Sequence, residues 1–162
     1  GASTAGVCNS GTWLQTLTPF QDLSATATCT QVASYVTALI DAANASGASM
    51  NAMLKAQMLA TALDVYFSTP GLGGNAIGAA QPIGGVKVNL TNVNAPPGST
   101  TFVNSSSSFG GAQSMTVANV LLYAASQSNA GGSLWYANVK SVQELAKDVF
   151  DAINNQVAQI VP

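Results

Sequence analysis

Histidine and arginine are both absent from this chain of 162 residues, and charged residues make up only 6% of it. Without histidine, the chain alone cannot form a Ser-His-Asp triad, a Cys-His pair or an imidazole metal site. A net charge of −2 with four lysines leaves little to neutralise a nucleic-acid backbone or to bind an anionic membrane surface. We therefore expect no nucleic-acid partner.

Several other signatures are also missing. The apolar runs, such as VLLYAA at 120–125, are too short to span a bilayer, so no membrane insertion is expected. No lysine follows a serine at S-x-x-K spacing, and no D-x-D-x-D calcium loop occurs. These gaps predict no catalytic residue, no metal and no cofactor.

The chain has two cysteines, Cys8 and Cys29. Such low charge is typical of secreted, cell-surface or assembled proteins, where an even pair of cysteines favours a disulfide. Two free buried thiols are the alternative. A disulfide closing a loop of this length would stabilise the fold by about 3 kcal/mol in the chain-entropy model. The N-terminal sequence GASTAGV is compatible with a mature or trimmed end.

Apolar spacing predicts one mainly α domain over 1–162, a bundle of about four helices with a small two-stranded β element and long Gly/Ser/Pro-rich loops. Residues 1–28 are expected as an extended lead-in tied down by the disulfide, and residues 29–162 as the helical core. The helices are expected at about 30–44, at 49–67, from Thr116 to the Gly131-Gly132 pair, and from Ser141 onward.

The β element is expected as an insertion near 86–103. Val86, Val88 and Leu90 alternate with polar residues, which is the pattern of a half-buried strand. Its expected partner is 100–103, reached through the turn Asn94-Ala-Pro-Pro-Gly98. Such a hairpin needs the helices for support.

The last helix has the clearest pattern. Ser141 and Glu144 have the spacing of a capping box, and an apolar stripe continues at helical spacing to Ile160. Lys147, Asp148 and Asp151 are expected on the opposite, outer face of this helix.

The stretch GGSLWYAN, residues 131–138, has two interpretations. Trp135 and Tyr136, with Asn138 as a hydrogen-bonding partner, could form a sugar-stacking platform, and Trp13 is a further candidate ligand-binding residue. Alternatively, the segment is a short helix-to-helix connection anchored over the end of the bundle. We favour the second interpretation, with Trp135 directed inward and Tyr136 more exposed.

Two further patterns were weighed for chemistry. Asp64, near the end of an apolar helix, is either a carboxyl group with a raised pKa or a partly exposed polar edge. The segment GLGGNA at 71–76 matches a relaxed dinucleotide fingerprint, but it follows a helix rather than a strand. We interpret it as a connector.

Three phrases of the sequence, at 51–75, 82–91 and 116–156, resemble an uncharacterised module of large secreted or cell-wall-associated bacterial proteins of actinobacterial type. The resemblance covers about two thirds of the chain and includes no catalytic signature. It implies an extracellular, cell-surface location among repetitive domains, and it implies no activity.

The leading hypothesis is therefore a non-catalytic structural or assembly module of a bacterial surface protein or filament, whose partners are neighbouring domains or copies of itself. An adhesion or glycan-binding module that uses exposed aromatic residues is the first alternative. A carboxylate-dependent hydrolase, with Asp64 as its only candidate, is the second.

Overall fold

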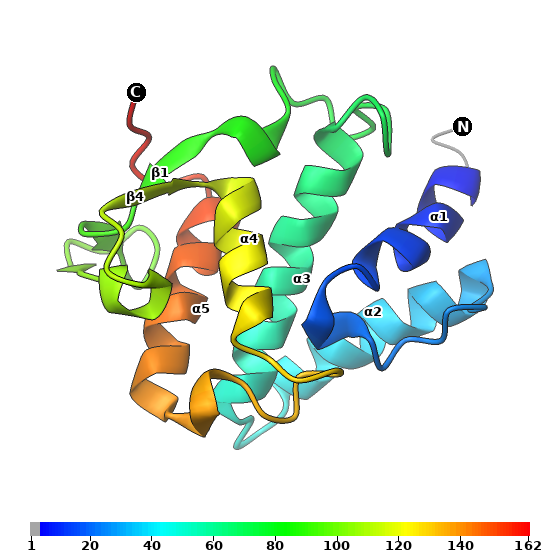
Figure 1. The fold of residues 1–162 in the computed structure, drawn as a ribbon, viewed down its shortest axis with the longest axis horizontal. Coiled ribbons are helices and arrows are strands. Elements are labelled where there is room, and N and C mark those ends of the chain that lie inside the picture. Colours follow the sequence, from blue (N-terminus) through cyan, green and yellow to red (C-terminus); the bar gives the residue numbers. More distant parts are fainter. Residues whose placement is uncertain (1–3) are drawn as a thin grey trace.

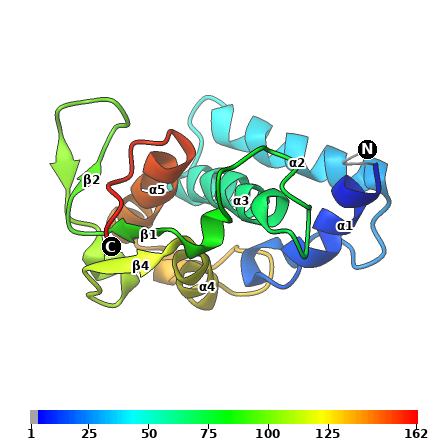
Figure 2. The ribbon, with the colours of Figure 1, turned by 90° about the horizontal axis from the view of Figure 1, so that it is seen from above.

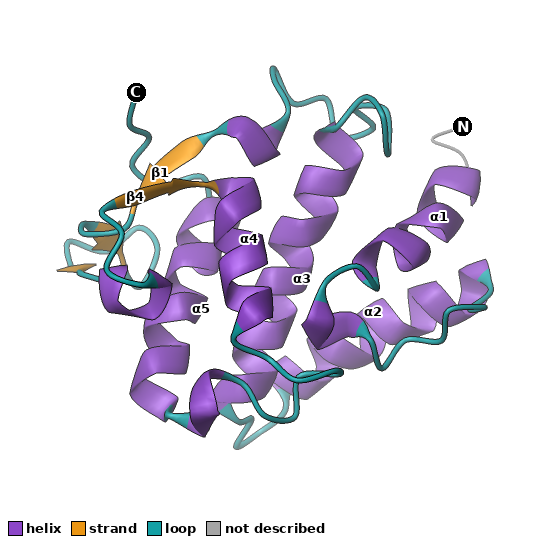
Figure 3. Ribbon diagram, in the orientation of Figure 1, coloured by secondary structure: helices purple, strands orange, loops and turns teal. Residues whose placement is uncertain are grey.

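The computed structural model describes residues 4–162 and has five α-helices and two small antiparallel sheets in that range (Figure 3). The mainly α prediction with a small β element is confirmed. The helices are α1 (Thr4–Leu14), α2 (Cys29–Asn44), α3 (Met50–Ser68), α4 (Val117–Ser126) and α5 (Lys140–Asn154). The strands are β1 (Lys87–Asn89), β2 (Val93–Asn94), β3 (Phe102–Val103) and β4 (Ser114–Thr116).

Helix α3 is the centre of the molecule. It runs side by side with α5, and the two helices are parallel, with their N-terminal ends at the same end of the bundle (Figure 1). Seen from above, α3 lies between α2 and α4 (Figure 2). Apolar side chains cover most of its circumference, as expected for a central helix. Its fully buried residues include Leu54, Met58 and Ala62.

A polar contact fixes the register of the parallel pair. The Thr61 hydroxyl on α3 donates to Asn154 Oδ1 on α5 at 2.7 Å, and Asn154 Nδ2 donates to the side-chain and backbone oxygens of Gln57. Buried amides need hydrogen-bond partners. A shift of one helix along the other would break these bonds, so the network favours one alignment of α3 and α5.

The N-terminal segment is more ordered than predicted. Residues 4–14 form α1 and Thr18–Phe20 form a 3₁₀ helix, so the extended lead-in is wrong for this part; residues 1–3 of that prediction lie outside the described residues. The apolar anchors of the segment are nevertheless buried as expected: Leu14, Leu17, Phe20 and Leu23. Helix α1 packs so closely on α2 that a Cβ at Gly11 would lie 2.5 Å from Val32 Cγ2.

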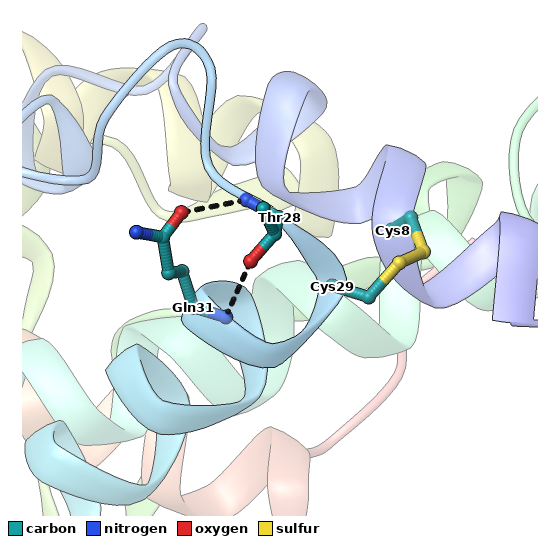
Figure 4. The surroundings of a disulfide bond; sticks show 4 residues. All are labelled: Cys8, Thr28, Cys29 and Gln31. Carbon is teal, nitrogen blue, oxygen red and sulfur yellow. Dashed lines mark hydrogen bonds between the residues drawn. A yellow bond between two sulfur atoms is a disulfide. The ribbon is translucent and has the colours of Figure 1, made fainter.

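The predicted disulfide is confirmed. Cys8 on α1 is bonded to Cys29 at the first turn of α2 (Figure 4). Beside it, the Thr28 hydroxyl accepts from the Gln31 N–H while Gln31 Oε1 accepts from the Thr28 N–H. This capping box satisfies two groups at the start of α2. The disulfide therefore joins α1 to a helix end whose position is already well defined.

The capping box predicted for α5 is wrong. The helix begins at Lys140, its N-cap is Val139, and no side chain caps it. Val139 offers only its carbonyl, which accepts from the N–H groups of Val142 and Gln143. The helix also ends earlier than predicted, at Asn154, because Gln156 adopts a left-handed conformation with φ of 59°. Ile160 consequently lies beyond the helix and is 67% exposed.

The predicted β hairpin is also wrong in its pairing. The strand pattern at Val88 and Leu90 is confirmed by their burial, but β1 pairs with β4 (Lys87↔Thr116), and the separate pair β2 and β3 forms the excursion between them. Strand alternation identifies a buried face but carries no information about the partner. The excursion packs against α5 and covers Asp148, which is 8% exposed, so the outer-face prediction for Asp148 is wrong.

Candidate functional site

The 131–138 connection closes the end of the core. Trp135 is fully buried, and its indole Nε1 donates to the Ala124 carbonyl at 2.8 Å. The inward direction predicted for Trp135 is confirmed. Tyr136 is only slightly more exposed, at 8%. Neither ring has a face free for a sugar to stack on.

Three consecutive residues in this connection form a left-handed turn. Tyr136, Ala137 and Asn138 have φ values of 50°, 51° and 55°. Each such residue costs about 1–2 kcal/mol because its Cβ crowds the following carbonyl. Asn138 Oδ1 accepts from the Trp135 N–H at 3.2 Å, and Gln143 Nε2 donates to the Trp135 carbonyl at 3.0 Å. These bonds on both sides of Trp135 hold the turn.

Asn138 lines a polar cavity of about 450 Å³ at the end of the bundle where α3 and α5 begin. The other polar residues of its lining are Ser49, Asn51, Ser133, Lys140 and Gln143, and Met50 and Met53 supply apolar contacts. Lys140 forms no ion pair with any residue in the described range. This cavity offers a polar ligand the Lys140 ammonium group as a donor and Asn51 Oδ1, which is buried without a partner, as an acceptor.

Trp13 is not part of that cavity. Its ring packs on Tyr66, with the ring centroids 5.6 Å apart, near the other end of α3. Of the four predicted ligand-binding residues, Trp135, Tyr136 and Asn138 therefore share one turn, and Trp13 is not brought to them. Asn138 lies in the wall of the polar cavity, Trp135 and Tyr136 are not among its lining residues, and Trp13 lies near the far end of the central helix.

An ionic cluster at the edge of the core, with Lys55 buried and Asp22 partly exposed, was missed by sequence reasoning. Lys55 Nζ on α3 donates to Asp22 Oδ2 at 2.7 Å and to the Gly131 carbonyl at 2.8 Å. The Tyr35 hydroxyl on α2 donates to Asp22 Oδ1 at 2.6 Å. Burial, followed by the bond to Asp22 and its charge, raises the pKa of Tyr35. The one available signal was a lysine within the mostly apolar helix α3.

This cluster joins four separated parts of the chain: the segment before α2, α2 itself, α3, and the loop before Trp135. Asn51 Nδ2 adds a bond to the Gly132 carbonyl at 2.8 Å. These contacts hold the four segments together, and Asn51 Oδ1 is the one buried side-chain oxygen among them that has no partner in the described chain.

Asp64 lines a second, larger cavity of about 660 Å³. Its side chain is half-buried, and burial raises the pKa of the carboxyl group, as its apolar neighbours predict. Asp64 forms no hydrogen bond or ion pair with any described residue. A single carboxyl group cannot supply both the acid and the base of a glycosidase.

GLGGNA lies beside this region and is a connector. The Gly73 N–H donates to the Tyr66 carbonyl at 2.9 Å, and the Ala76 N–H donates to the Phe67 carbonyl at 2.8 Å. A Cβ at Gly73 would lie 2.6 Å from Phe67 Cα, so the turn requires glycine there. The segment folds back on α3 and closes its C-terminal carbonyls.

Within residues 4–162, no group of three or more histidine, cysteine, aspartate or glutamate side chains could hold a metal ion. In the same range, no helix has the length and apolar character needed to cross a membrane. No protein-family model matches the chain, and neither curated proteins nor solved structures show significant similarity to it.

Proposed function

We propose that this chain is a non-catalytic extracellular module of a bacterial surface protein or filament, with a structural or assembly role. The disulfide between α1 and α2 is the observation that carries this proposal. Disulfides of this kind persist in oxidising compartments and are rare in the cytosol. The resemblance of the sequence to modules of secreted and wall-associated proteins agrees with this placement.

The distribution of charge supports the assembly role. Five of the ten lysine and acidic residues form intramolecular ion pairs: Lys55, Asp22, Lys147, Asp148 and Asp151. The exposed surface is left mainly to uncharged polar groups and to isolated apolar side chains such as Phe102, Leu122 and Leu134. A surface with little net charge has weak repulsion between copies, which favours association.

Light scattering coupled to size-exclusion chromatography tests the assembly role. The oxidised protein should show a mass that rises with concentration, and negative-stain microscopy should show defined oligomers or filaments at the upper end. A single monomeric mass across the whole range would contradict self-assembly.

The extracellular placement has its own test. Thiol labelling of protein taken directly from its source cells should find no reactive cysteine until a reductant is added. Two free thiols in freshly isolated protein would contradict an oxidising compartment.

A glycan-binding role is the second candidate, and the polar cavity beside Asn138 favours it. Because the aromatic rings are buried, recognition there would use amide groups and Lys140 rather than stacking. A glycan array should then show binding by the native protein and weaker binding by Lys140→Ala, with the distant Lys87→Ala as the matched control. No binding by the native protein would eliminate this role.

A further inference from the structure

We propose that the cavity at Asp64 is a binding site for a small organic ammonium ion with an apolar body. This inference goes beyond the proposed assembly role and does not depend on it. The cavity volume of about 660 Å³ lies within the range of small-molecule sites.

The walls of the cavity come from separated parts of the chain. Helix α3 supplies Asp64, and the remaining lining comes from the 77–86 segment, strand β1, the start of α4, the end of α5 and the segment after it. Three side chains of the lining are amides, Gln81, Asn154 and Gln156, and the larger aliphatic ones are Ile77, Ile83, Val86, Val88, Val117, Ile153 and Ile160. Such walls suit a hydrocarbon body.

The charge of the cavity determines which polar group a ligand with an apolar body should carry. Asp64 is the only ionisable residue of the lining in the described chain. Lys87 lies between the lining residues Val86 and Val88, but strand alternation directs it to the other side, and its Nζ donates to the Pro162 carbonyl at 2.8 Å. No lysine therefore neutralises the cavity.

The C-terminal ends of α3 and α5 add negative potential at the cavity, against one N-terminal end, that of α4 at Val117. Because α3 and α5 are parallel, their C-terminal ends lie at the same end of the bundle as this cavity (Figure 1). Neither helix has a basic residue in its last turn. Helix C-termini carry partial negative charge and favour a cation.

The carboxyl group also lacks a partner. Asp64 accepts no hydrogen bond from a described residue, and its half-burial weakens the hydration of the carboxylate. An ammonium ion would supply both the charge and the donors, while its apolar body would cover aliphatic surface. An alcohol of the same shape would supply only a neutral donor, and a carboxylate would be repelled.

Adamantylamine, adamantanol and adamantane carboxylate are suitable probes because they share one apolar body. Amide chemical-shift titrations of the native protein should place the perturbations at residues such as Ala79, Val88 and Ile153. The amine should bind at least about tenfold more tightly than the alcohol, as expected for a charge-assisted hydrogen bond. The carboxylate should bind most weakly.

Asp64→Asn keeps the shape of the side chain and removes its charge. It should reduce the affinity for the amine to that for the alcohol. The matched control is Asp41→Asn, which removes the same charge from an exposed position on α2 and should leave the preference intact. A thermal transition recorded for each variant verifies that it folds.

A second measurement uses only the native protein. The pKa of Asp64, followed through its side-chain carbon resonance, should fall when adamantylamine is added, since a bound cation favours the carboxylate. The proposal is overturned if the amine preference survives in Asp64→Asn, if the pKa of Asp64 is unmoved, or if no probe saturates at millimolar concentration. If the probe binds only at high protein concentration, the site depends on contact between two copies of the chain. That result would also overturn the proposal.

Discussion

Ala137 occupies a backbone conformation that its side chain disfavours. It is exposed and has φ of 51°, so its methyl group adds strain without filling a buried space. We predict that Ala137→Gly raises the free energy of unfolding by about 1 kcal/mol, because glycine adopts left-handed angles without a steric cost.

The control replaces alanine by glycine at a position with normal right-handed helical angles. Ala38→Gly, at an exposed position inside α2, should lower the free energy of unfolding by about 1 kcal/mol. Urea denaturation of both variants measures the difference. Two changes of the same sign would contradict the left-handed turn.

The cluster at Lys55 predicts an asymmetry between its two charged partners. Asp22→Ala leaves the Lys55 ammonium, whose side chain is 11% exposed, without its counter-ion. Lys55→Met fills the same space without charge and leaves Asp22, whose side chain is 44% exposed, in contact with water. We expect the free energy of unfolding to fall by about 1–3 kcal/mol in Asp22→Ala and by less in Lys55→Met.

Denaturation of the two single variants and the double variant measures this asymmetry. The double variant should lose less stability than the sum of the single changes, because the first change already breaks the pair. Additive losses would show that Lys55 and Asp22 do not interact.

At the scale of the elements, the disulfide joins a short helix to the bundle. Replacing both cysteines by alanine, in Cys8→Ala/Cys29→Ala, should lower the free energy of unfolding by about 3 kcal/mol through the larger freedom of the unfolded chain. Hydrogen exchange should quicken most in α1, which is a short helix at one side of the bundle (Figure 2).

Thr28→Ala is the companion variant, because it removes the capping box beside the disulfide and keeps the bond. Thr28→Ala should lower the free energy of unfolding by about 1 kcal/mol, because the first turn of α2 loses its side-chain cap. Equal stability of the native and double-alanine proteins would contradict the role of the disulfide.

The elements also differ in how far the sequence predicts them. Helices α2 to α5 were predictable because each buries a set of apolar residues at helical spacing. Helix α1 was missed because Gly6 and Gly11 are poor helix formers, and its helix depends on packing against α2. The pairing of β1 with β4 spans a long excursion that no local pattern encodes.

The candidate sites follow the same division. Asp64 was predictable as a half-buried acid because the residues beside it in α3 are apolar, although the walls of its cavity come from other segments, and Trp135 was predictable because a short connection needs an anchor. The polar cavity beside Asn138 and the cluster at Lys55 were not predictable, since each depends on segments that meet only in the folded chain.

At the scale of the whole molecule, the small number of ionisable groups predicts an unusual pH dependence. Burial raises the pKa of Asp64, and burial is also the largest cause of the raised pKa of Asp151. A carboxyl group whose pKa is higher in the folded state contributes stability below its unfolded pKa, near pH 4, and that stability is lost as the pH rises. These two residues therefore favour the folded state more in mild acid than at neutral pH.

Tyr35 and Tyr136 act in the same direction at high pH. Burial raises the pKa of both, so their contribution is complete below about pH 10 and is lost above it. Denaturant unfolding at mildly acidic, neutral and alkaline pH should show a decreasing free energy of unfolding. In Asp64→Asn the free energy of unfolding should change less between mildly acidic and neutral pH. In Tyr35→Phe it should change less between neutral and alkaline pH. An optimum at neutral pH in the native protein would contradict these assignments.

The parallel pairing of α3 and α5 also determines when the core can form. Two adjacent helices in a chain can pack as soon as both exist, but α5 begins more than seventy residues after α3 ends. Loop closure of that length precedes the main contacts, which slows folding relative to a bundle of neighbouring antiparallel helices. During synthesis, the apolar face of α3 must remain without its main partner until α5 has left the ribosome.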